Sequence, residues 1–323
     1  MEDQFKRQIE YMRISITDRC NLRCSYCMPP EGVRWLPSSE VLSYEEILRF
    51  VNLSTELGFK KFRVTGGEPL VRKGVISFLQ KLASNPGVED LTLTTNGILL
   101  GGMAQELKNV GVRRVNVSLD TLDSKKFSEI TRGGNLQDVL AGINKSLEVG
   151  LHPVKVNVVV IRGFNDDELE AFFHMAEQQP LHIRFIELMP VGASEGNKNL
   201  VPVEEMKARL GLSNLVPLKE FQGAGPAQHY AGEGMKGSIG FISALSQHFC
   251  SECNRIRLTA DGKLRPCLHS TKELDLRTLL RNGASDLELK ELLAEAILLK
   301  PGQHYMNAEG WQGRERVMSQ IGG

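Results

Sequence analysis

The chain has 323 residues, of which 41% are hydrophobic, and its 39 basic residues equal its 39 acidic residues in number. A chain of this length can bury the core of one large or two ordinary domains, so its stability does not depend on disulfides. Zero net charge excludes the long-range attraction that drives non-specific binding of nucleic acid. No stretch approaches the roughly 20 apolar residues of a membrane span or the pattern of a signal peptide, so we expect a cytoplasmic protein without nucleic-acid or membrane partners.

Short β-branched runs alternate with helical segments from the start of the chain to about residue 190. The segments 43–58 and 135–150 have apolar residues at helical spacing and a closing glycine. Because parallel strands are joined by right-handed crossovers, this alternation predicts a parallel sheet, either open and doubly wound or curled into a barrel. The predicted strands are residues 12–16, 61–65, 90–95, 113–119, 154–161 and 182–188.

The predicted strands carry polar side chains on one face and mostly apolar side chains on the other. A parallel sheet with helices on both sides is apolar on both faces, so a polar face favours an incomplete barrel around a polar ligand over a solvated open sheet. We therefore predict an incomplete, six-unit, TIM-like α/β barrel over residues 1–195. The predicted inward face comprises Arg13, Ser15, Thr17, Lys61, Arg63, Thr65, Thr92, Thr94, Asn116, Ser118, Lys155, Asn157, Glu187 and Met189.

The alternation stops after residue 190, so residues 196–323 are predicted to form a separate C-terminal region. Glycine-rich loops flank a short predicted helix at 203–211. The pair Asp261-Gly262 is a two-residue hairpin signal, and that hairpin is expected to return the chain toward residue 250. Capping-box patterns at Ser270 to Glu273 and at 285–288 predict two final helices, the second of which ends at the Lys300-Pro301 pair.

The six cysteines fall into two groups of three, one near each end of the chain. In the cytoplasm thiols stay reduced, so closely spaced cysteines are more often metal ligands or redox groups than disulfide partners. A four-iron cluster with three protein ligands keeps one iron open for a substrate or cofactor, much as catalytic zinc keeps a free position. There are two alternatives. One is a zinc site completed by a histidine, and the other is a disulfide. The first triplet is Cys20, Cys24 and Cys27, and the second is Cys250, Cys253 and Cys267.

Several motifs carry a resemblance to a known family. ISITDRCNLRCSYCMPPEG resembles the three-cysteine loop of the radical S-adenosylmethionine (SAM) superfamily, and TGGEPL at 65–70 resembles the glycine-rich turn after its second strand. CSECNRIRLTADGKLRPCL is similar to the C-terminal cluster motif of the molybdenum cofactor biosynthesis protein A family, the GTP cyclases of that pathway. The segment from 300 to the terminal Gly-Gly is similar to the tail of the same family, so the resemblance runs almost end to end.

The resemblance implies a radical SAM barrel with one 4Fe–4S cluster on each triplet. By this resemblance, SAM binds the open iron of the first cluster and the second cluster lies against the guanine of GTP. The terminal Gly322 and Gly323 are expected to reach into the active site, because glycine permits a close backbone approach. The implied SAM contacts are Tyr26, Gly67, Ser118 and Met189. The implied GTP contacts are Arg13, Arg63, Thr94, Lys155, Arg255 and Arg257.

The positions of Arg255 and Arg257 also support an interpretation that does not depend on the resemblance. They follow the second triplet at strand spacing, so their guanidiniums point the same way, and planar forks of this kind suit phosphate oxygens. Lys263 and Arg265, across the predicted hairpin, are expected to add to this basic patch. A solvated basic hairpin is the alternative, and the individual roles of the two arginines stay open.

The implied activity is conversion of GTP to (8S)-3′,8-cyclo-7,8-dihydroguanosine 5′-triphosphate, an early step of molybdenum cofactor biosynthesis. The expected partners are GTP, an electron donor, the next enzyme of the pathway and, in a homodimer, a second copy of the chain. A radical SAM enzyme that modifies peptides is one alternative. A non-catalytic zinc protein that uses the second triplet with His248 or His269 is another. Asp123 and Glu187 are carboxylates near the expected site without an assigned role.

Three positions depart from the family pattern. The Phe-Gly-Arg that often precedes the first strand is Phe5-Lys6-Arg7 in this chain. His269 stands where the family commonly has an aromatic residue, and Leu200 lies in a region that often holds tryptophan. None of these departures falls on a predicted cluster ligand.

Overall fold

The computed structural model describes residues 1–191, 196–211, 215–218, 225–306 and 316–322. It contains one curved sheet of 12 strands in the order β12-β11-β10-β1-β2-β3-β4-β5-β6-β9-β8-β7. All neighbouring strands from β10 through β9 are parallel, and the pairs at each end are antiparallel. The parallel strands are β1 (Tyr11–Ser15), β2 (Lys61–Thr65), β3 (Asp90–Thr95), β4 (Arg114–Ser118), β5 (Val154–Val160), β6 (Leu181–Glu187), β9 (Ser238–Ile242) and β10 (Arg255–Leu258). The outer strands are β7 (Val216–Pro217), β8 (Gln228–Ala231), β11 (Lys263–Arg265) and β12 (Leu274–Asp275).

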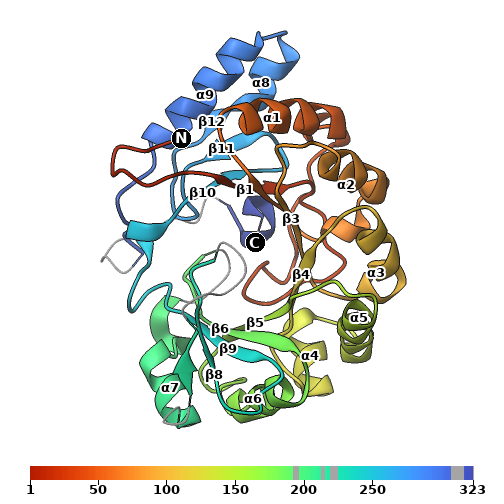
Figure 1. The fold of residues 1–323 in the computed structure, drawn as a ribbon, viewed down its shortest axis with the longest axis vertical. Coiled ribbons are helices and arrows are strands. Elements are labelled where there is room, and N and C mark those ends of the chain that lie inside the picture. The colour runs from red at the N-terminus through yellow and green to blue at the C-terminus, as the bar shows by residue number, and fades with distance from the viewer. Residues whose placement is uncertain (192–195, 212–214, 219–224, 307–315, 323) are drawn as a thin grey trace.

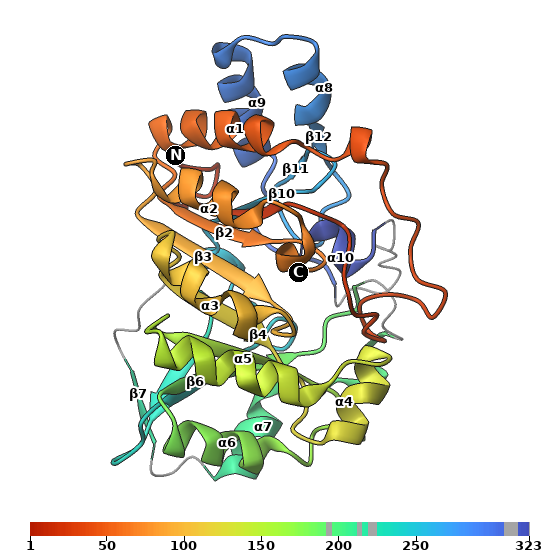
Figure 2. The same ribbon diagram turned by 90° about the vertical axis from the view of Figure 1, so that its right-hand side faces the viewer.

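Helices cover the convex side of the sheet, as Figures 1 and 2 show. The short C-terminal helix α10 lies on the other side, within the arc of strands (Figure 1). The helices are α1 (Tyr44–Glu56), α2 (Val75–Ala83), α3 (Leu100–Asn109), α4 (Ser124–Thr131), α5 (Leu136–Glu148), α6 (Leu169–Gln178), α7 (Val203–Leu210), α8 (Leu276–Arg281), α9 (Asp286–Leu298) and α10 (Met318–Ile321). Within the described ranges, no helix combines the length and the apolar character needed to cross a bilayer.

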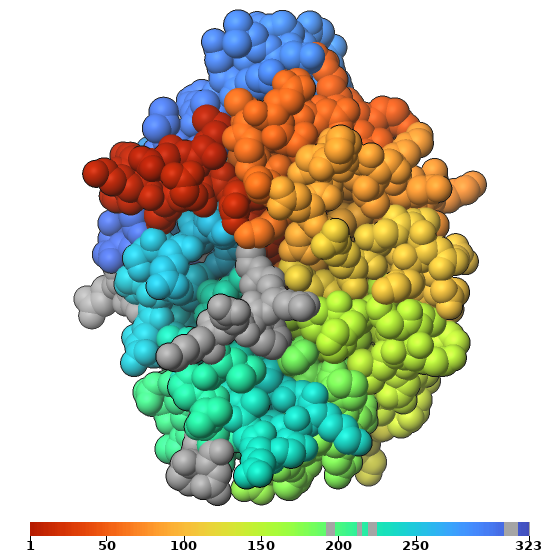
Figure 3. Space-filling view, viewed as in Figure 1, coloured from red at the N-terminus to blue at the C-terminus, as the bar shows by residue number. Residues whose placement is uncertain are grey.

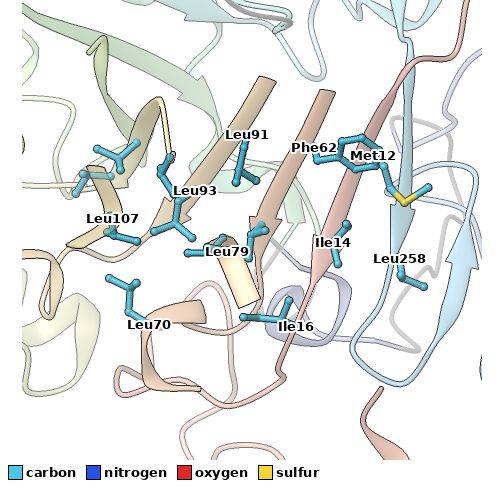
Figure 4. Packing of buried hydrophobic residues seen from close by; sticks show 14 of the residues in the cluster. Met12, Ile14, Ile16, Phe62, Leu70, Leu79, Leu91, Leu93, Leu107 and Leu258 are labelled. Atoms are coloured by element: carbon cyan, nitrogen blue, oxygen red, sulfur yellow. The ribbon is translucent and has the colours of Figure 1, made fainter. Parts of the chain in front are cut away.

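The apolar faces of the strands form the core, as the alternation in the sequence predicts. Met12, Ile14, Phe62 and Leu93 are completely buried and pack against helix residues such as Leu79 (Figure 4). Burial of each such side chain contributes roughly 1.5–3 kcal/mol, so this layer holds the helices against the sheet. The opposite faces of the same strands are left to line the interior of the arc.

The six predicted barrel strands are confirmed with small shifts at their ends. The hairpin prediction is also confirmed, since β10 and β11 pair antiparallel around Gly262, which has a φ of 78°. The C-terminal region extends the barrel sheet on both sides, because β9 pairs with β6 and β10 pairs with β1. The sheet therefore brings the two cysteine triplets, distant in sequence, to neighbouring strands.

The helix starts depend on capping side chains. Ser43 and Ser285 form the capping boxes of α1 and α9, and the second confirms the prediction for 285–288. The predicted box at Ser270 to Glu273 is wrong: α8 begins after Asp275, whose carboxylate accepts from the Thr278 amide. Glu273 instead forms ion pairs with two arginines, since a guanidinium is a stronger partner for a carboxylate than a backbone amide is.

The α8–α9 pair rests on the first helix of the barrel. Ion pairs join Arg49 of α1 to Asp286 of α9 at 2.7 Å and Arg281 of α8 to Glu46 of α1 at 2.7 Å. The space-filling view shows the C-terminal helices in blue beside the orange N-terminal helix (Figure 3). Because these pairs are solvent-exposed, each contributes at most about 1 kcal/mol, and they fix the orientation of the helices more than their stability.

The N-terminal departure at Lys6 has a structural consequence. Lys6 adopts a φ of 61°, in the left-handed region that disfavours residues with a Cβ. We expect Lys6→Gly to raise the free energy of unfolding by about 0.5–1 kcal/mol, because glycine relieves this strain at some entropic cost in the unfolded state. Denaturant unfolding of the metal-free protein measures this change. Lys6→Ala is the control: it removes the side chain, keeps the strain, and should leave the free energy of unfolding close to that of the native chain.

Candidate active site

The arc of strands encloses a cavity that both cysteine triplets line. The carboxyl ends of the parallel strands meet there, which is the usual position of active sites in barrels of this kind. Nearly all of the predicted ligand contacts reach it. The predicted residues that line the cavity are Arg13, Cys20, Cys24, Tyr26, Cys27, Arg63, Thr65, Gly67, Thr94, Ser118, Asn157, Met189, Cys250, Cys253, Arg255, Arg257 and Cys267.

The first triplet lies in the loop that follows β1. Its three thiols are free and partly exposed, and the Cys20 Sγ accepts from the Leu22 amide at 3.4 Å and from Asn96 Nδ2 at 3.7 Å. Burial raises the pKa of Cys20 to about 11, and burial together with the Cys20 thiolate raises the pKa of Cys27 to about 12. Thiols ligate as thiolates, so this set requires a bound cation at neutral pH. Three thiols of one short loop that line the same cavity suit an iron–sulfur cluster with one open iron.

The glycine-rich turn after β2 is closely packed against this loop. A Cβ on Gly67 would lie 2.4 Å from the Arg19 carbonyl oxygen, so only glycine fits. The next residue, Glu68, is fully buried and accepts from the amide of Asn96 at 2.7 Å and from Thr95 Oγ1 at 2.8 Å. Burial raises the pKa of Glu68 to about 7. Glu68 therefore fixes Asn96, which in turn contacts the Cys20 sulfur.

Asp120, after β4, is a cavity residue that the sequence analysis did not single out. Its Oδ2 accepts from the Tyr26 hydroxyl at 2.7 Å and its Oδ1 from the Val159 amide at 2.8 Å. Burial raises the pKa of Asp120 to about 6. The position directly after a strand, in SLD, was the available signal. Asp120 holds Tyr26 between the cysteines of the first triplet and beside the predicted SAM position.

The cysteines of the second triplet come from two segments of the chain, which we call its two arms. Cys250 and Cys253 lie just before β10, and Cys267 follows β11, so the hairpin joins them at one wall of the cavity as predicted. Although burial alone would raise it, Arg255 and Lys300 hold the pKa of Cys253 at about 6. The Cys267 Sγ lies 2.9 Å from Nδ1 of His269. In the part of the chain that the structure describes, no three His, Cys, Asp or Glu groups surround a single-ion site.

Five arginines line the cavity, and they are buried or nearly so. Burial and the neighbouring Arg257 and Arg63 lower the pKa of Arg13 well below its usual range. The Arg13 Nε and the Thr94 Oγ1 are buried without a hydrogen-bond partner among the described residues. Buried polar atoms are normally satisfied, so these orphan groups indicate a polar ligand, and the surplus of positive charge indicates an anion. The arginines are Arg13, Arg63, Arg184, Arg255 and Arg257.

The sixth strand differs from the prediction. Arg184 and Ile186 of β6 face the cavity, and the predicted inward residue Glu187 is fully buried elsewhere. The Glu187 carboxylate accepts from the amides of Val203 at 3.0 Å and Leu245 at 2.7 Å, so it ties α7 to the loop after β9. Buried backbone amides without a strand partner explain why a carboxylate lies there. Met189 still reaches the cavity because it lies beyond the end of the strand.

Three further basic residues of the prediction are absent from the described lining of the cavity. Lys263 pairs with Asp275 at 2.6 Å, and Arg265 forms an ion pair with Glu273, so neither extends the basic patch. Lys155 is buried in β5 and is absent from the described lining of the cavity. Burial, with Arg184, Arg114 and Arg63 nearby, lowers the pKa of Lys155 to about 6. Lys155 therefore shares the inward face of β5 with the lining residue Asn157, two residues nearer the start of the strand and close to Arg63 and Arg184.

The C-terminal tail enters the arc. The Gly322 carbonyl accepts from Arg257 Nη1 at 3.3 Å, and Gly322 has a φ of 84°. Arg316 anchors the tail, since its guanidinium binds Asp261 and Glu273, each at 2.8 Å. Gly323 lies outside the described residues. Asp123, the other unassigned carboxylate, caps α4 by accepting from the Lys125 and Lys126 amides at 2.7 and 2.9 Å.

Comparison with known proteins supports this arrangement. Residues 14–176 match the model of the radical SAM superfamily, and residues 181–306 match the model named Molybdenum Cofactor Synthesis C. The chain is 52% identical over 327 residues to the GTP 3′,8-cyclase of Pelotomaculum thermopropionicum, and 50% identical over 329 residues to that of Desulforamulus reducens. Each alignment covers 100% of both chains.

One solved structure shows the same fold at low sequence identity. Streptococcus suis SuiB aligns with a TM-score of 0.63 and 13% identity, over 97% of this chain and 77% of the other. At this identity the likeness concerns the fold alone. The full-length relatives above, and not this neighbour, bear on the chemistry.

Proposed function

Because the chain belongs to the GTP 3′,8-cyclase family of radical SAM enzymes, we propose that it converts GTP into (8S)-3′,8-cyclo-7,8-dihydroguanosine 5′-triphosphate in molybdenum cofactor biosynthesis. The single observation that carries the proposal is the cavity shared by two cysteine triplets and five arginines, of which Arg63, Arg184 and Arg257 are buried. One triplet fits the SAM cluster of the superfamily. The arginines supply what a nucleoside triphosphate needs, since each guanidinium is a planar fork for phosphate oxygens.

The first triplet and the residues around it are proposed to bind the cluster and SAM. When bound, the cluster and SAM would supply the one-electron chemistry of SAM cleavage. Tyr26, fixed by Asp120, would orient SAM from one side, and Gly67 would allow its close approach to the turn after β2. Ser118 and Met189 line the same end of the cavity. The work of the protein here is orientation and electrostatics, because the cofactor performs the difficult bond cleavage.

We propose that the second triplet holds a second 4Fe–4S cluster and that GTP lies between the two clusters. The product joins ribose C3′ to guanine C8, so the chain must hold these atoms near one another and near SAM. Arg255 and Arg257, which precede the hairpin turn, would hold phosphates together with Arg13, Arg63 and Arg184. The Thr94 hydroxyl, which has no hydrogen-bond partner among the described residues, would donate a hydrogen bond to GTP. Lys155 would act through its charge from the inward face of β5, near Arg63 and Arg184.

The tail is proposed to close the cavity. Gly322 packs against Ser15 and Thr65, and Arg257 links its carbonyl to the phosphate-binding wall. Exclusion of water protects a reactive radical from side reactions. Gly323, one residue further, would continue toward the substrate.

The remaining assignments are proposals of the same kind. We assign the barrel and the first triplet to residues 1–195 and the second triplet and tail to residues 196–323, although the two regions share one sheet. We propose that the protein is cytoplasmic. Its proposed partners are an electron donor, the next enzyme of the pathway and a second copy of the chain.

An anaerobic assay with GTP, SAM and a reductant tests the function. We expect about eight irons per chain and 5′-deoxyadenosine that forms together with the cyclised nucleotide only when GTP is present. If 5′-deoxyadenosine formed with a peptide and not with GTP, the chain would be a peptide-modifying enzyme. A colourless protein with one or two zinc ions would instead indicate a non-catalytic zinc protein.

The depressed pKa of Lys155 predicts proton uptake on GTP binding. A pH of 8 is above the Lys155 pKa of about 6, so the Lys155 amine of the free protein is largely neutral. A bound triphosphate offsets the neighbouring guanidiniums, raises this pKa and draws a proton from solution. Calorimetric titration with GTP in buffers of different ionisation enthalpy should therefore show uptake at pH 8 and little at pH 5. Lys155→Arg, which stays charged, should abolish the uptake; equal heats in all buffers for the native chain would contradict the prediction.

A further inference from the structure

Lys300, just after α9, is a buried cation at the second triplet. Only 2% of its surface is exposed, and it lines the cavity. Its ammonium donates to the Cys253 Sγ at 3.4 Å, to the Arg255 carbonyl at 2.8 Å and to the Pro266 carbonyl at 3.0 Å. An ammonium has three N–H donors, so this geometry uses all of them.

The three acceptors of Lys300 lie on both arms of the triplet. Cys253 and Arg255 belong to the arm that enters β10, and Pro266 immediately precedes Cys267 on the arm that leaves β11. One side chain from a third segment therefore fixes the distance between the two arms. Lys300 thus adds a direct link between the arms to the short β10–β11 ladder, in which Arg257 lies opposite Arg265.

The positive charge of Lys300 also suits a position beside the thiolates of the second triplet. Among the ion pairs found in the described part of the chain, none joins Lys300 to a carboxylate. A buried ammonium without a negative partner is costly, since carbonyl dipoles offset only part of its lost hydration. The thiolates of the second triplet, with a cluster of net negative charge, provide the missing counter-charge.

We propose that Lys300 is a positioning residue for the second cluster: it holds the two cysteine arms together and places a positive charge beside the cluster. This inference rests on the second cluster of the proposed function. A positive charge near the cluster favours its more negative, reduced form, so Lys300 is expected to raise the reduction potential.

Arg7 offers a matched comparison, because it contacts the segment that directly follows Lys300. It donates to the carbonyls of Cys250 at 2.6 Å and of Pro301 at 2.8 Å, so it also braces one arm against the residues that follow α9. Its guanidinium contacts backbone carbonyls, the Asp3 carboxylate at 2.6 Å and the Phe5 ring at 5.1 Å, and within the described residues it has no hydrogen bond to a sulfur. Arg7 therefore shares the bracing task of Lys300 but not its charge at the cluster.

The experiment uses the full chain with Cys20, Cys24 and Cys27 changed to alanine, so that only the second cluster is present. Lys300→Met, Lys300→Arg and Arg7→Met are each added to this background. Iron per chain, the rate of iron loss to a chelator and the midpoint potential from an EPR-monitored redox titration are measured under anaerobic conditions. None of these readouts depends on turnover.

We expect Lys300→Met to lose iron several-fold faster and to have a more negative midpoint potential. Lys300→Arg should recover most of the potential, because it keeps the charge. Arg7→Met should lose iron faster with its potential unchanged. If Lys300→Met retains no cluster, recovery of iron in Lys300→Arg supports the proposal.

Two results would overturn the proposal in distinguishable ways. If Lys300→Met matched the background chain in iron loss and potential, Lys300 would have no positioning role although the second cluster would stand. If the background chain bound no iron while the native chain bound about four, the second cluster itself would be absent, and the inference about Lys300 would fail with it.

Discussion

Gly322→Ala should abolish cyclisation while the chain keeps its full iron content. Gly322 has a φ of 84°, and a Cβ there would lie 2.7 Å from the Ser15 Cβ and 3.2 Å from the Thr65 Cγ2. The tail must then withdraw, which breaks the bond from Arg257 and opens the cavity to water. Backbone strain of 1–2 kcal/mol with a clash of similar size predicts a loss of about 100-fold or more in rate.

The measurement for Gly322→Ala is the rate of GTP-dependent 5′-deoxyadenosine formation, with iron determined on the same sample. Gly283→Ala is a matched control: Gly283 has a φ of 79°, but nothing lies within 4 Å of an added Cβ. It should carry the same backbone strain and keep its activity. Removal of both Gly322 and Gly323 should likewise abolish cyclisation and spare the iron. Full activity of the truncated chain would refute a role for the tail.

Replacing the two cysteine triplets separately should produce two different defects. With Cys20, Cys24 and Cys27 changed to alanine, we expect about half of the iron and no SAM cleavage under any condition, a loss of at least about 1,000-fold. The first triplet is the one that shares its end of the cavity with Tyr26 and Asp120. The cluster that opens the reaction is expected to be held there.

With the second triplet changed to alanine, the iron should again fall by about half, but slow SAM cleavage should persist without cyclised product. The chain has only six cysteines, so iron that remains in either variant is held by the other triplet or by a different residue type. Iron quantification, EPR spectra and product analysis by mass spectrometry distinguish these cases. If the second-triplet variant still cyclised GTP, the proposed task of that cluster would be wrong.

The barrel strands were predictable because most of them follow a local rule. Arg13 alternates with Ile14, and Arg63 with Val64, so parity alone separates the inward face from the core face on β1 and β2. The rule failed on β6, where Glu187 satisfies amides of distant segments. No local pattern identifies such a partner, since Val203 and Leu245 reach it only in the folded chain.

Capping shows the same limit. Ser285 and Glu288 form the predicted box, and within the described residues no cation pairs with the Glu288 carboxylate. Glu273 has the same local pattern, but Arg265 and Arg316 take its carboxylate. A charged partner from far along the chain outweighs a nearby amide, and sequence spacing contains no record of that partner.

By itself the sequence determined the parallel βα barrel, the two cysteine triplets, the resemblance to a radical SAM cyclase and many, but fewer than half, of the residues that line the cavity. These features depend on periodicity and on motifs within a few residues of one another. Only the tertiary structure decided that Arg184 joins the cationic wall, that Asp120 holds Tyr26, and that Lys300 bridges the second triplet. Each of these is a contact between side chains brought together by strand order, and burial, which makes an unpaired charge or amide costly, selects the partner.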